Sequence, residues 1–250
     1  MALQPLGVRR VYRQVAEQLR DLLANGHYPP GARLPPERDI AAQLKVSRTT
    51  VREALIALEL EGLVEVRGGS GVYVLARPRT NSLAIEMGDS GPGPFELLQA
   101  RRVLEGEIAA LAAQTIDDAG LASLEDAIRE LETNGHSSIA RETTDRQFHM
   151  TLAEATRNSV LIQTVRMYWD MRRGSMWTKI VEHFHTPELL SAVAADHRAI
   201  LATVKERSPA GARRAMHRHL RRVEREFAQS WNPTDKAESD AADPAVAPRK

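Results

Sequence analysis

The chain has 250 residues, of which 42% are hydrophobic and 27% charged, so it can bury a core and is not disordered as a whole. It contains no cysteine, which excludes disulfides, thiolate zinc sites and cysteine nucleophiles. No run of about 18 apolar residues is present, and the first residues lack the pattern of a signal peptide. We therefore expect a cytoplasmic protein without a membrane partner.

The net charge of +1 hides an uneven distribution of charge along the chain. Residues 1–78 carry 11 Lys and Arg against 8 Asp and Glu, whereas the remaining residues carry 23 against 25. This asymmetry indicates a basic binding module joined to a separate body.

The first 76 residues predict three helices followed by a hairpin. Apolar residues recur at helical spacing in the first segment, a proline pair opens the second, and Ser47 is a suitable N-cap for the third. Two alternating segments joined by a glycine-rich loop then predict a β-hairpin. The predicted elements are helices 11–24, 37–44 and 48–61 and strands 63–67 and 72–75. This order is that of a winged helix-turn-helix domain.

The rest of the chain predicts a different architecture. Residues 77–94 are rich in Pro, Gly and Ser and predict a linker, and residues 232–250 have little to bury and predict a disordered tail. Between them, residues 95–231 lack strand-like alternation and predict an all-α helical bundle that binds an effector and dimerises. The predicted helices are 95–114, 117–133, 138–156, 158–174, 175–184, 187–206 and 209–230. The fold class is therefore mainly α.

The start of helix 48–61 has the residues of a DNA-reading helix. In helix-turn-helix proteins this end enters the major groove. Arg48 and Arg52 are one turn apart, and an arginine can contact guanine with two hydrogen bonds. Threonine hydroxyls suit phosphates or base edges. A solvated basic face is the alternative. The candidate residues are Arg38, Ser47, Arg48, Thr49, Thr50, Arg52, and Arg67 and Gly68 on the hairpin.

Histidines in the bundle raise the question of a metal site. Asp145 and His149 are four residues apart and share one helix face. His197 and His219 fall on the apolar stripes of their helices, and a buried imidazole needs a partner for its nitrogens. These four residues have the composition of a three-His, one-Asp site. Spacing alone leaves open the alternative that these are ordinary core histidines without a metal. The histidines at positions 183 and 185 are competing candidates for metal ligands.

Three segments of the first domain resemble the N-terminal signature of the GntR family of bacterial transcription regulators. They are Pro29-Pro-Gly-Ala-Arg-Leu-Pro-Pro-Glu-Arg38, Val46-Ser-Arg-Thr-Thr-Val-Arg-Glu-Ala-Leu55 and Leu58-Glu-Leu-Glu-Gly-Leu63. The resemblance covers residues 11–75. It implies that the residues matching Arg38, Arg48, Thr49, Thr50, Arg52 and Gly68 contact operator DNA.

The second domain is similar to the ligand-binding domain of the FadR-type branch of this family. The similarity lies in Asp145-x-x-x-His149, in His197 with Ala199-Ile-Leu201, and in Ala212-x-x-x-Met216-x-x-His219-Leu220. In metal-binding members of that branch, one Asp and three His hold a divalent ion. The resemblance thus implies Asp145, His149, His197 and His219 as ligands, with zinc as the first candidate and nickel or another transition metal as alternatives.

The effector implied by these resemblances is a small carboxylate. Arginines recognise carboxylates with paired hydrogen bonds, and the candidates are Arg101, Arg102 and Arg172, with residue 173 beside the last and Asn158 in a position common in this domain. The segments 93–101, 147–149, 155–159 and 10–14 look like the hexuronate-regulon repressors, which respond to sugar acids such as galacturonate or fructuronate. A lactate-like hydroxy acid with a structural metal is the alternative.

A metal-dependent enzyme and a purely architectural DNA-binding protein without sequence preference or effector response are the competing functional classes. A three-His metal site with an open position can generate hydroxide, but the sequence has no HExxH, GxSxG or phosphate-loop motif. We therefore expect no catalysis. The predicted function is that of a homodimeric transcription regulator, specifically a repressor, whose two winged helix-turn-helix domains bind an inverted repeat in double-stranded DNA.

Overall fold

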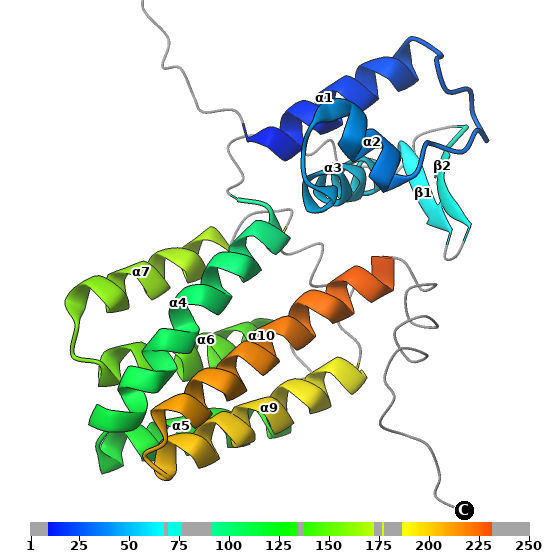
Figure 1. Cartoon of the computed structure of the whole chain (residues 1–250). Helices are drawn as coiled ribbons and strands as arrows, with labels where there is room; N and C mark the ends of the chain where they lie inside the picture. The colour runs from blue at the N-terminus through cyan, green and yellow to red at the C-terminus, as the bar shows by residue number, and fades with distance from the viewer. Residues whose placement is uncertain are drawn as a thin grey trace, which may run out of the picture. The chain divides into compact units, whose positions relative to one another are not determined.

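The structure is a computed structural model that describes residues 10–67, 70–76, 92–134, 138–172, 177 and 187–231. The chain divides into two compact units, of which the second comprises Pro94–Phe227, and each is treated by itself below (Figure 1). The predicted tail, most of the predicted linker and most of the predicted helix 175–184 lie outside the described residues.

The first unit is a winged helix-turn-helix, as the sequence predicts. Its helices and strands are α1 (Val11–Ala24), α2 (Glu37–Leu44), α3 (Arg48–Leu60), β1 (Val64–Arg67) and β2 (Gly71–Val74). The two strands pair antiparallel, with Val64 opposite Val74 and Arg67 opposite Gly71. The predicted bounds of α1 and α2 are confirmed, and α3 ends one residue earlier than expected.

Local chemistry explains where α3 begins and which way it faces. The Ser47 hydroxyl accepts a hydrogen bond of 3.0 Å from the Thr50 amide, which satisfies one of the unpaired donors of the first turn. On the opposite side, Val51, Ala54, Leu55 and Leu58 are fully buried. Because α3 packs against α1 and α2 through this apolar face, its N-terminal polar face is left for solvent.

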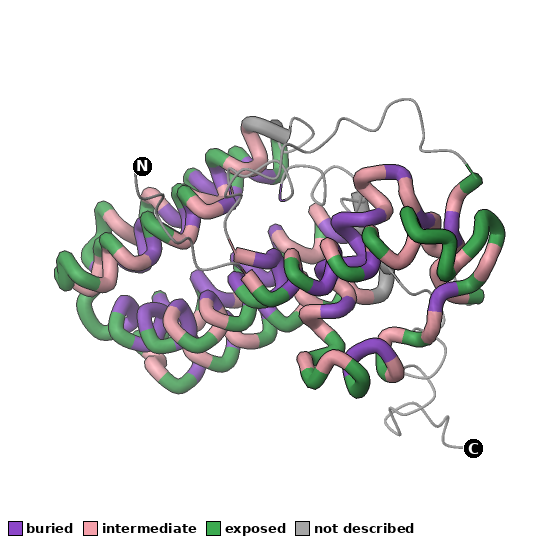
Figure 2. The backbone as a smooth tube through the Cα atoms, turned by 90° about the horizontal axis from the view of Figure 1, so that it is seen from above, coloured by how far each residue is buried: buried purple, intermediate pink, exposed green. Residues whose placement is uncertain are grey.

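The second unit is an all-α bundle (Figures 1 and 2). Its described helices are α4 (Pro94–Thr115), α5 (Asp118–Asn134), α6 (Ser138–Ala155), α7 (Ser159–Met171), α9 (Pro187–Lys205) and α10 (Pro209–Trp231). Helix α6 lies against α4, α5 and α7, and α9 lies against α4 and α5. Among the described residues, no helix is long and apolar enough to span a membrane.

The core of this bundle is unusual because charged and polar side chains lie within it. Most buried positions on α4 are apolar, as in Phe95, Leu98 and Ile108. Between them, Arg101 and Glu105 are only 3% and 2% exposed. Ionisable groups are rarely this deeply buried without partners, so their position marks the part of the bundle that needs explanation. The other buried ionisable residues of the bundle are His149, Arg172, Asp196, His197 and His219.

Candidate DNA-binding and metal sites

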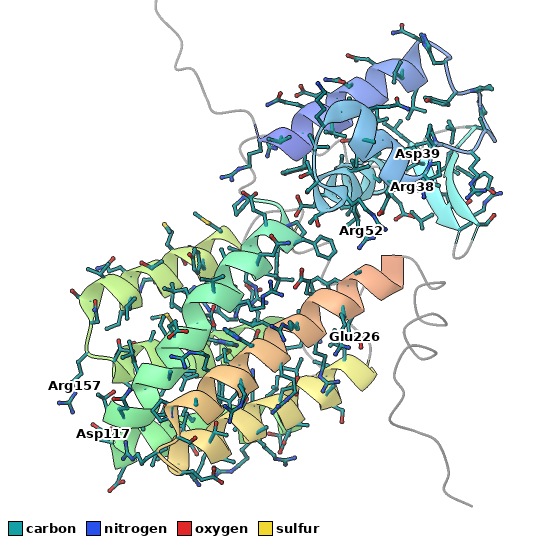
Figure 3. The ribbon with its side chains drawn as sticks, viewed as in Figure 1. Arg38, Asp39, Arg52, Asp117, Arg157 and Glu226 are labelled. Carbon is teal, nitrogen blue, oxygen red and sulfur yellow. The ribbon has the colours of Figure 1, made fainter. Side chains whose placement is uncertain are left out.

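Two of the basic residues predicted to contact DNA, Arg38 and Arg48, are exposed on α2 and α3. Arg48 is exposed at the first position of α3. The Arg38 side chain on α2 is 80% exposed and pairs with Asp39 at 3.1 Å (Figure 3). Ser47 is exposed, and Thr49 and Thr50 are half-buried. The structure therefore offers a positively charged side chain at the helix end that enters the major groove in this class of domain.

Arg52 and Arg67 are held by neighbouring acidic side chains. Arg52 forms a two-bonded pair with Glu37 of α2, with distances of 3.0 and 2.9 Å, and both side chains are mostly buried. Arg67 pairs with Glu65 at 3.0 Å and lies over the Tyr73 ring. Arg52 thus joins α2 to α3 in this structure, and DNA contact by it would require a change of partner. Gly68 lies outside the described residues.

In the bundle, the four predicted metal ligands come together. One ligand atom from each of Asp145, His149, His197 and His219 lies within 4.8 Å of all the others. The Asp145 Oδ1 atom is 3.6 Å from His149 Nε2 and 3.4 Å from His197 Nε2. In tetrahedral zinc sites with bonds of about 2.1 Å, neighbouring ligand atoms are about 3.4 Å apart. Helices α6, α9 and α10 supply these residues from far apart in the sequence.

The donor atoms of this cluster fit a cation. Asp145 Oδ1, His149 Nε2 and His197 Nε2 are buried, and the described part of the chain provides none of them with a hydrogen-bond partner. Buried polar atoms are normally paired. A divalent ion among the four residues would satisfy these atoms, and imidazole and carboxylate are ligands that zinc and similar ions accept.

The protonation states in the cluster follow from burial and from the neighbouring charges. Burial lowers the pKa of His197 well below its ordinary value, and the charge of His219 lowers it further. The pKa of His219 is also lowered, chiefly by burial. Burial alone would raise the pKa of Asp145, but interactions with His149 and Arg172 outweigh it and hold the pKa well below the usual range. Neutral imidazoles and an ionised carboxylate are the forms that bind metal.

A cavity of about 40 Å³ adjoins the cluster. It has room for a few water molecules. Three arginines, Arg101, Arg141 and Arg172, line it together with Asp145, His219 and a larger number of apolar side chains from α9 and α10. Arg172 contacts Asp145 at 3.2 Å, and burial lowers its pKa to about 10. The cavity thus combines the candidate metal ligands with groups that recognise carboxylates.

Two of the predicted effector residues lie elsewhere. Arg102 pairs with Glu224 of α10 at 3.2 Å, and it does not line the cavity. Asn158 is the N-cap of α7 and accepts hydrogen bonds from the amides of Val160 and Leu161. The structure therefore places these two residues apart from Arg101 and Arg172, with an ion pair and a helix cap as their contacts, and their part in effector binding stays a prediction. Residue 173 and the competing histidines 183 and 185 lie outside the described residues.

Arg172 is enclosed by aromatic rings. Its guanidinium carbon is 3.9 Å from the centroid of Trp169 and 4.7 Å from that of Trp177. Stacking of this kind stabilises a buried cation. Arg172 Nε and the indole nitrogens of both tryptophans are buried without a hydrogen-bond partner among the described residues, and of these three residues Arg172 and Trp177 line the cavity.

Three residues around the cluster were not predicted from the sequence to be functional. Glu105 lies against Nδ1 of His149, Asp196 lies 3.7 Å from Nδ1 of His219, and Arg141 lines the cavity. For Glu105 a signal existed, because it falls on the inward stripe of α4 with Phe95 and Ile108. Its contact with His149 could not be read from spacing, because the two residues are on different helices.

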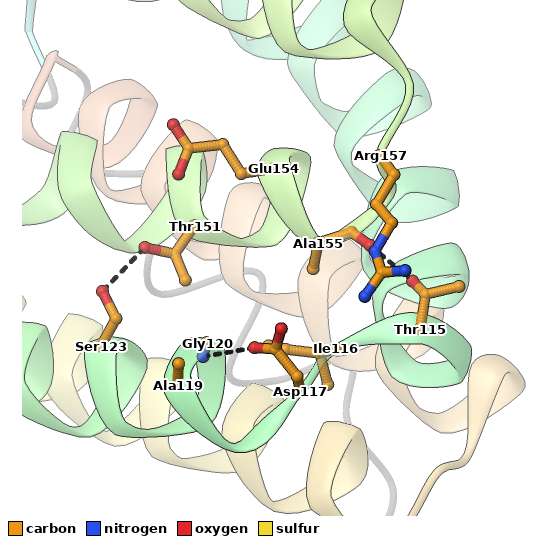
Figure 4. A pocket seen from close by; sticks show the side chains of 10 residues that line it. All are labelled: Thr115, Ile116, Asp117, Ala119, Gly120, Ser123, Thr151, Glu154, Ala155 and Arg157. Atoms are coloured by element: carbon orange, nitrogen blue, oxygen red, sulfur yellow. Dashed lines mark hydrogen bonds between the residues drawn. The ribbon is translucent and has the colours of Figure 1, made fainter.

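A second, larger hollow of about 300 Å³ lies where the α4–α5 turn meets the end of α6 (Figure 4). Several of its polar groups have hydrogen-bond partners within the chain. Asp117 accepts a hydrogen bond from the Gly120 amide at 2.9 Å, and the Thr115 hydroxyl donates to the carbonyl of Ala155 at 2.7 Å. None of the residues predicted for the metal or the effector lines it.

A winged helix-turn-helix followed by a helical ligand domain defines a class of effector-responsive DNA-binding regulators. Comparison with known families gives the particular family. Residues 11–74 match the bacterial regulatory proteins of the gntR family, and residues 96–222 match the FCD domain. The chain belongs to the GntR family of transcription regulators with an FCD domain, and it is a DNA-binding protein and not an enzyme.

Curated relatives cover almost the whole chain. The Uxu operon transcriptional regulator of Escherichia coli K12 is 39% identical over 91% of this chain and 90% of its own length. The Exu regulon transcriptional regulator of the same strain is 40% identical over 85% of this chain and 82% of its own length. A putative L-lactate dehydrogenase operon regulatory protein from that strain is 32% identical, covering 85% of this chain and 84% of the relative.

Proposed function

We propose that this regulator is a homodimeric repressor whose hold on an inverted-repeat operator is released by a hexuronate or related sugar acid. The effector would bind beside a divalent ion, zinc first, held by Asp145, His149, His197 and His219. The observation that carries the proposal is the buried cluster of unpartnered ligand atoms, which adjoins a cavity lined by guanidinium groups. It would act on DNA in the bacterial cytoplasm.

The chemistry of the cavity favours an anionic oxygen ligand. When bound, the ion would attract the carboxylate and hydroxyl oxygens of a sugar acid. Arg172 and Arg101 would orient the carboxylate from the cavity wall. The closer identity to the Uxu and Exu regulators than to the lactate dehydrogenase operon protein supports a sugar acid over lactate.

The size of the cavity suggests how effector binding would reach the DNA-binding domain. A six-carbon acid is larger than the space of about 40 Å³, so its binding would have to widen the bundle around it. A ligand shifts a conformational equilibrium only if it binds one state more tightly than the other. The widened bundle would be the state that releases the operator.

Exposed apolar side chains support a dimer. Val103 and Leu111 lie eight residues apart on α4, and Val160 and Met167 lie seven apart on α7; all four are exposed. Helices α4 and α7 contact each other, so the four side chains belong to neighbouring helices. If a second copy of the chain covered these four side chains, a twofold axis would relate the two winged domains of the dimer, as binding to an inverted repeat requires.

A thermal-shift series tests the effector and the ion together. Zinc-loaded protein is heated with D-fructuronate, D-galacturonate, D-gluconate or L-lactate, and the series is repeated after removal of the metal with a chelator. We expect one sugar acid to raise the melting temperature by mass action and the shift to vanish without zinc. A shift that survives chelation indicates a structural metal, and a shift with lactate alone favours the hydroxy-acid alternative.

Operator release is the second measurement. A duplex selected by this protein from a random pool is labelled, and its binding is followed by fluorescence anisotropy as the active acid is added. His219→Ala should abolish the response, whereas His217→Ala, two residues away and outside the cluster, should preserve it. Unchanged DNA affinity at saturating acid would refute the proposed control.

A further inference from the structure

Glu105 is a buried carboxylate that is not one of the four candidate metal ligands. It lies on α4 and is 2% exposed, while the ligands lie on α6, α9 and α10. Helix α4 packs against α6, and this contact brings Glu105 to His149. A carboxylate this deeply buried needs strong partners to stay ionised.

Glu105 has two such partners, Arg101 and His149. Oε1 accepts a hydrogen bond of 2.6 Å from Nε of Arg101, one turn earlier on the same helix. Oε2 accepts a longer hydrogen bond of 3.5 Å from Nη2 of Arg101, and it lies against Nδ1 of His149 in a close contact that lacks the geometry of a regular hydrogen bond. The other ring nitrogen of His149, Nε2, points to Asp145 Oδ1 at 3.6 Å. The two nitrogens of one ring thus face a carboxylate on one side and the candidate metal position on the other.

The contact between Glu105 and His149 bears on which ring nitrogen of His149 carries the hydrogen. An imidazole ligand must present an unprotonated nitrogen to the metal, and the hydrogen bond made by the opposite nitrogen sets the tautomer. Carboxylates that receive this hydrogen bond orient the ring and make the ligand more basic. We propose that Glu105 is a positioning residue, which accepts a hydrogen bond from the Nδ1–H of His149 and so presents Nε2 to the ion. This proposal rests on the metal site of the proposed function.

Arg101 has a supporting part in this arrangement. Its guanidinium holds Glu105 and stacks on Trp169, with 4.7 Å from its carbon to the ring centroid. It also lines the cavity. Arg101 therefore connects the wall of the effector cavity to His149 through a single carboxylate.

The first test measures zinc affinity by competition with a chromogenic chelator. Glu105→Gln keeps the size of the side chain and removes its charge. Loss of such an outer carboxylate weakens metal binding by about 10- to 100-fold, and we expect a change of that size. Glu107→Gln is the matched control, because Glu107 is on the same helix, is 56% exposed and pairs with Arg213 outside the cluster. The control should bind zinc as the wild type does.

Glu105→Gln leaves Arg101 buried without its charged partner, which destabilises the fold. The double variant Arg101→Met/Glu105→Gln removes both charges at similar volume and keeps the proposal testable. If Glu105 positions His149, the double variant still binds zinc about 10- to 100-fold more weakly. If Glu105 serves only to neutralise Arg101, the double variant regains wild-type zinc affinity, and the proposal is overturned.

A spectroscopic measurement reports the tautomer directly. Nitrogen-15 spectra of the histidines in the zinc-loaded wild type should show His149 with a protonated Nδ1 and a metal-bound Nε2. The opposite tautomer would refute the positioning role even if the affinity changes. A wild type that binds no zinc would overturn the proposed metal site as well, whereas zinc binding that is normal in both Glu105 variants would overturn this inference alone.

Discussion

Zinc binding should release one proton, and this number follows from the environment of each ligand. Burial lowers the pKa values of His197 and His219, so both are neutral near pH 7. Asp145 is already ionised because its pKa is held well below the usual range. Burial would also lower the pKa of His149, but the charge of Glu105 and the interaction with Asp145 outweigh burial and raise it. Only His149 must lose a proton when the ion binds.

The magnitude follows from linkage. Below the raised pKa of His149, the release of one proton makes the zinc dissociation constant fall about tenfold for each unit of rising pH, which is about 1.4 kcal/mol per unit. Above that pKa the affinity levels off. Titration calorimetry in two buffers of different ionisation enthalpy counts the protons, and chelator competition from about pH 6 to about pH 8 gives the slope.

Two results would refute this reasoning. Release of no proton near pH 6.5 would mean that His149 either is already neutral or is not a ligand, and release of about three would mean that burial does not keep His197 and His219 neutral. His217→Gln is the control, because His217 lies on α10 near His219 but outside the cluster. It should leave both the proton count and the slope unchanged.

Four further outcomes are expected. Arg48→Ala should weaken operator binding by about 1–3 kcal/mol in anisotropy titrations, and an equal loss on random duplex would place Arg48 on a phosphate. Ser47→Ala should cost about 1 kcal/mol of unfolding free energy in urea titrations, because the Thr50 amide loses its cap; an unchanged midpoint contradicts this. Arg172→Lys should weaken sugar-acid binding roughly 10- to 150-fold in calorimetry while zinc still binds, and loss of both would make Arg172 structural. Val160→Asp should yield monomers in sedimentation experiments if α7 lies in the dimer contact, and an intact dimer would place the contact elsewhere.

Local patterns determined much of the fold. The bounds of α1 and α2 and the cap of α3 follow from apolar spacing and from single residues such as Ser47, because helix starts and amphipathic faces are set by neighbours within a few positions. The inward direction of His197 and His219 was predictable for the same reason, whereas spacing placed His149 only on the same helix face as Asp145. A residue on an apolar stripe is buried whatever its partner, so the sequence places these rings in the core.

The partners of these residues were decided by the tertiary structure alone. Glu105 on one helix contacts His149 on another, and Arg52 pairs with Glu37. Arg102 pairs with Glu224, although the residue before it, Arg101, lines the cavity. Contacts between helices depend on how each helix is rotated and how far it is shifted along its neighbour. Helical periodicity indicates the rotation of a helix approximately, but it says nothing of the shift along the neighbouring helix. The sequence therefore determined which chemical groups are available in the core, and packing decided which of them meet.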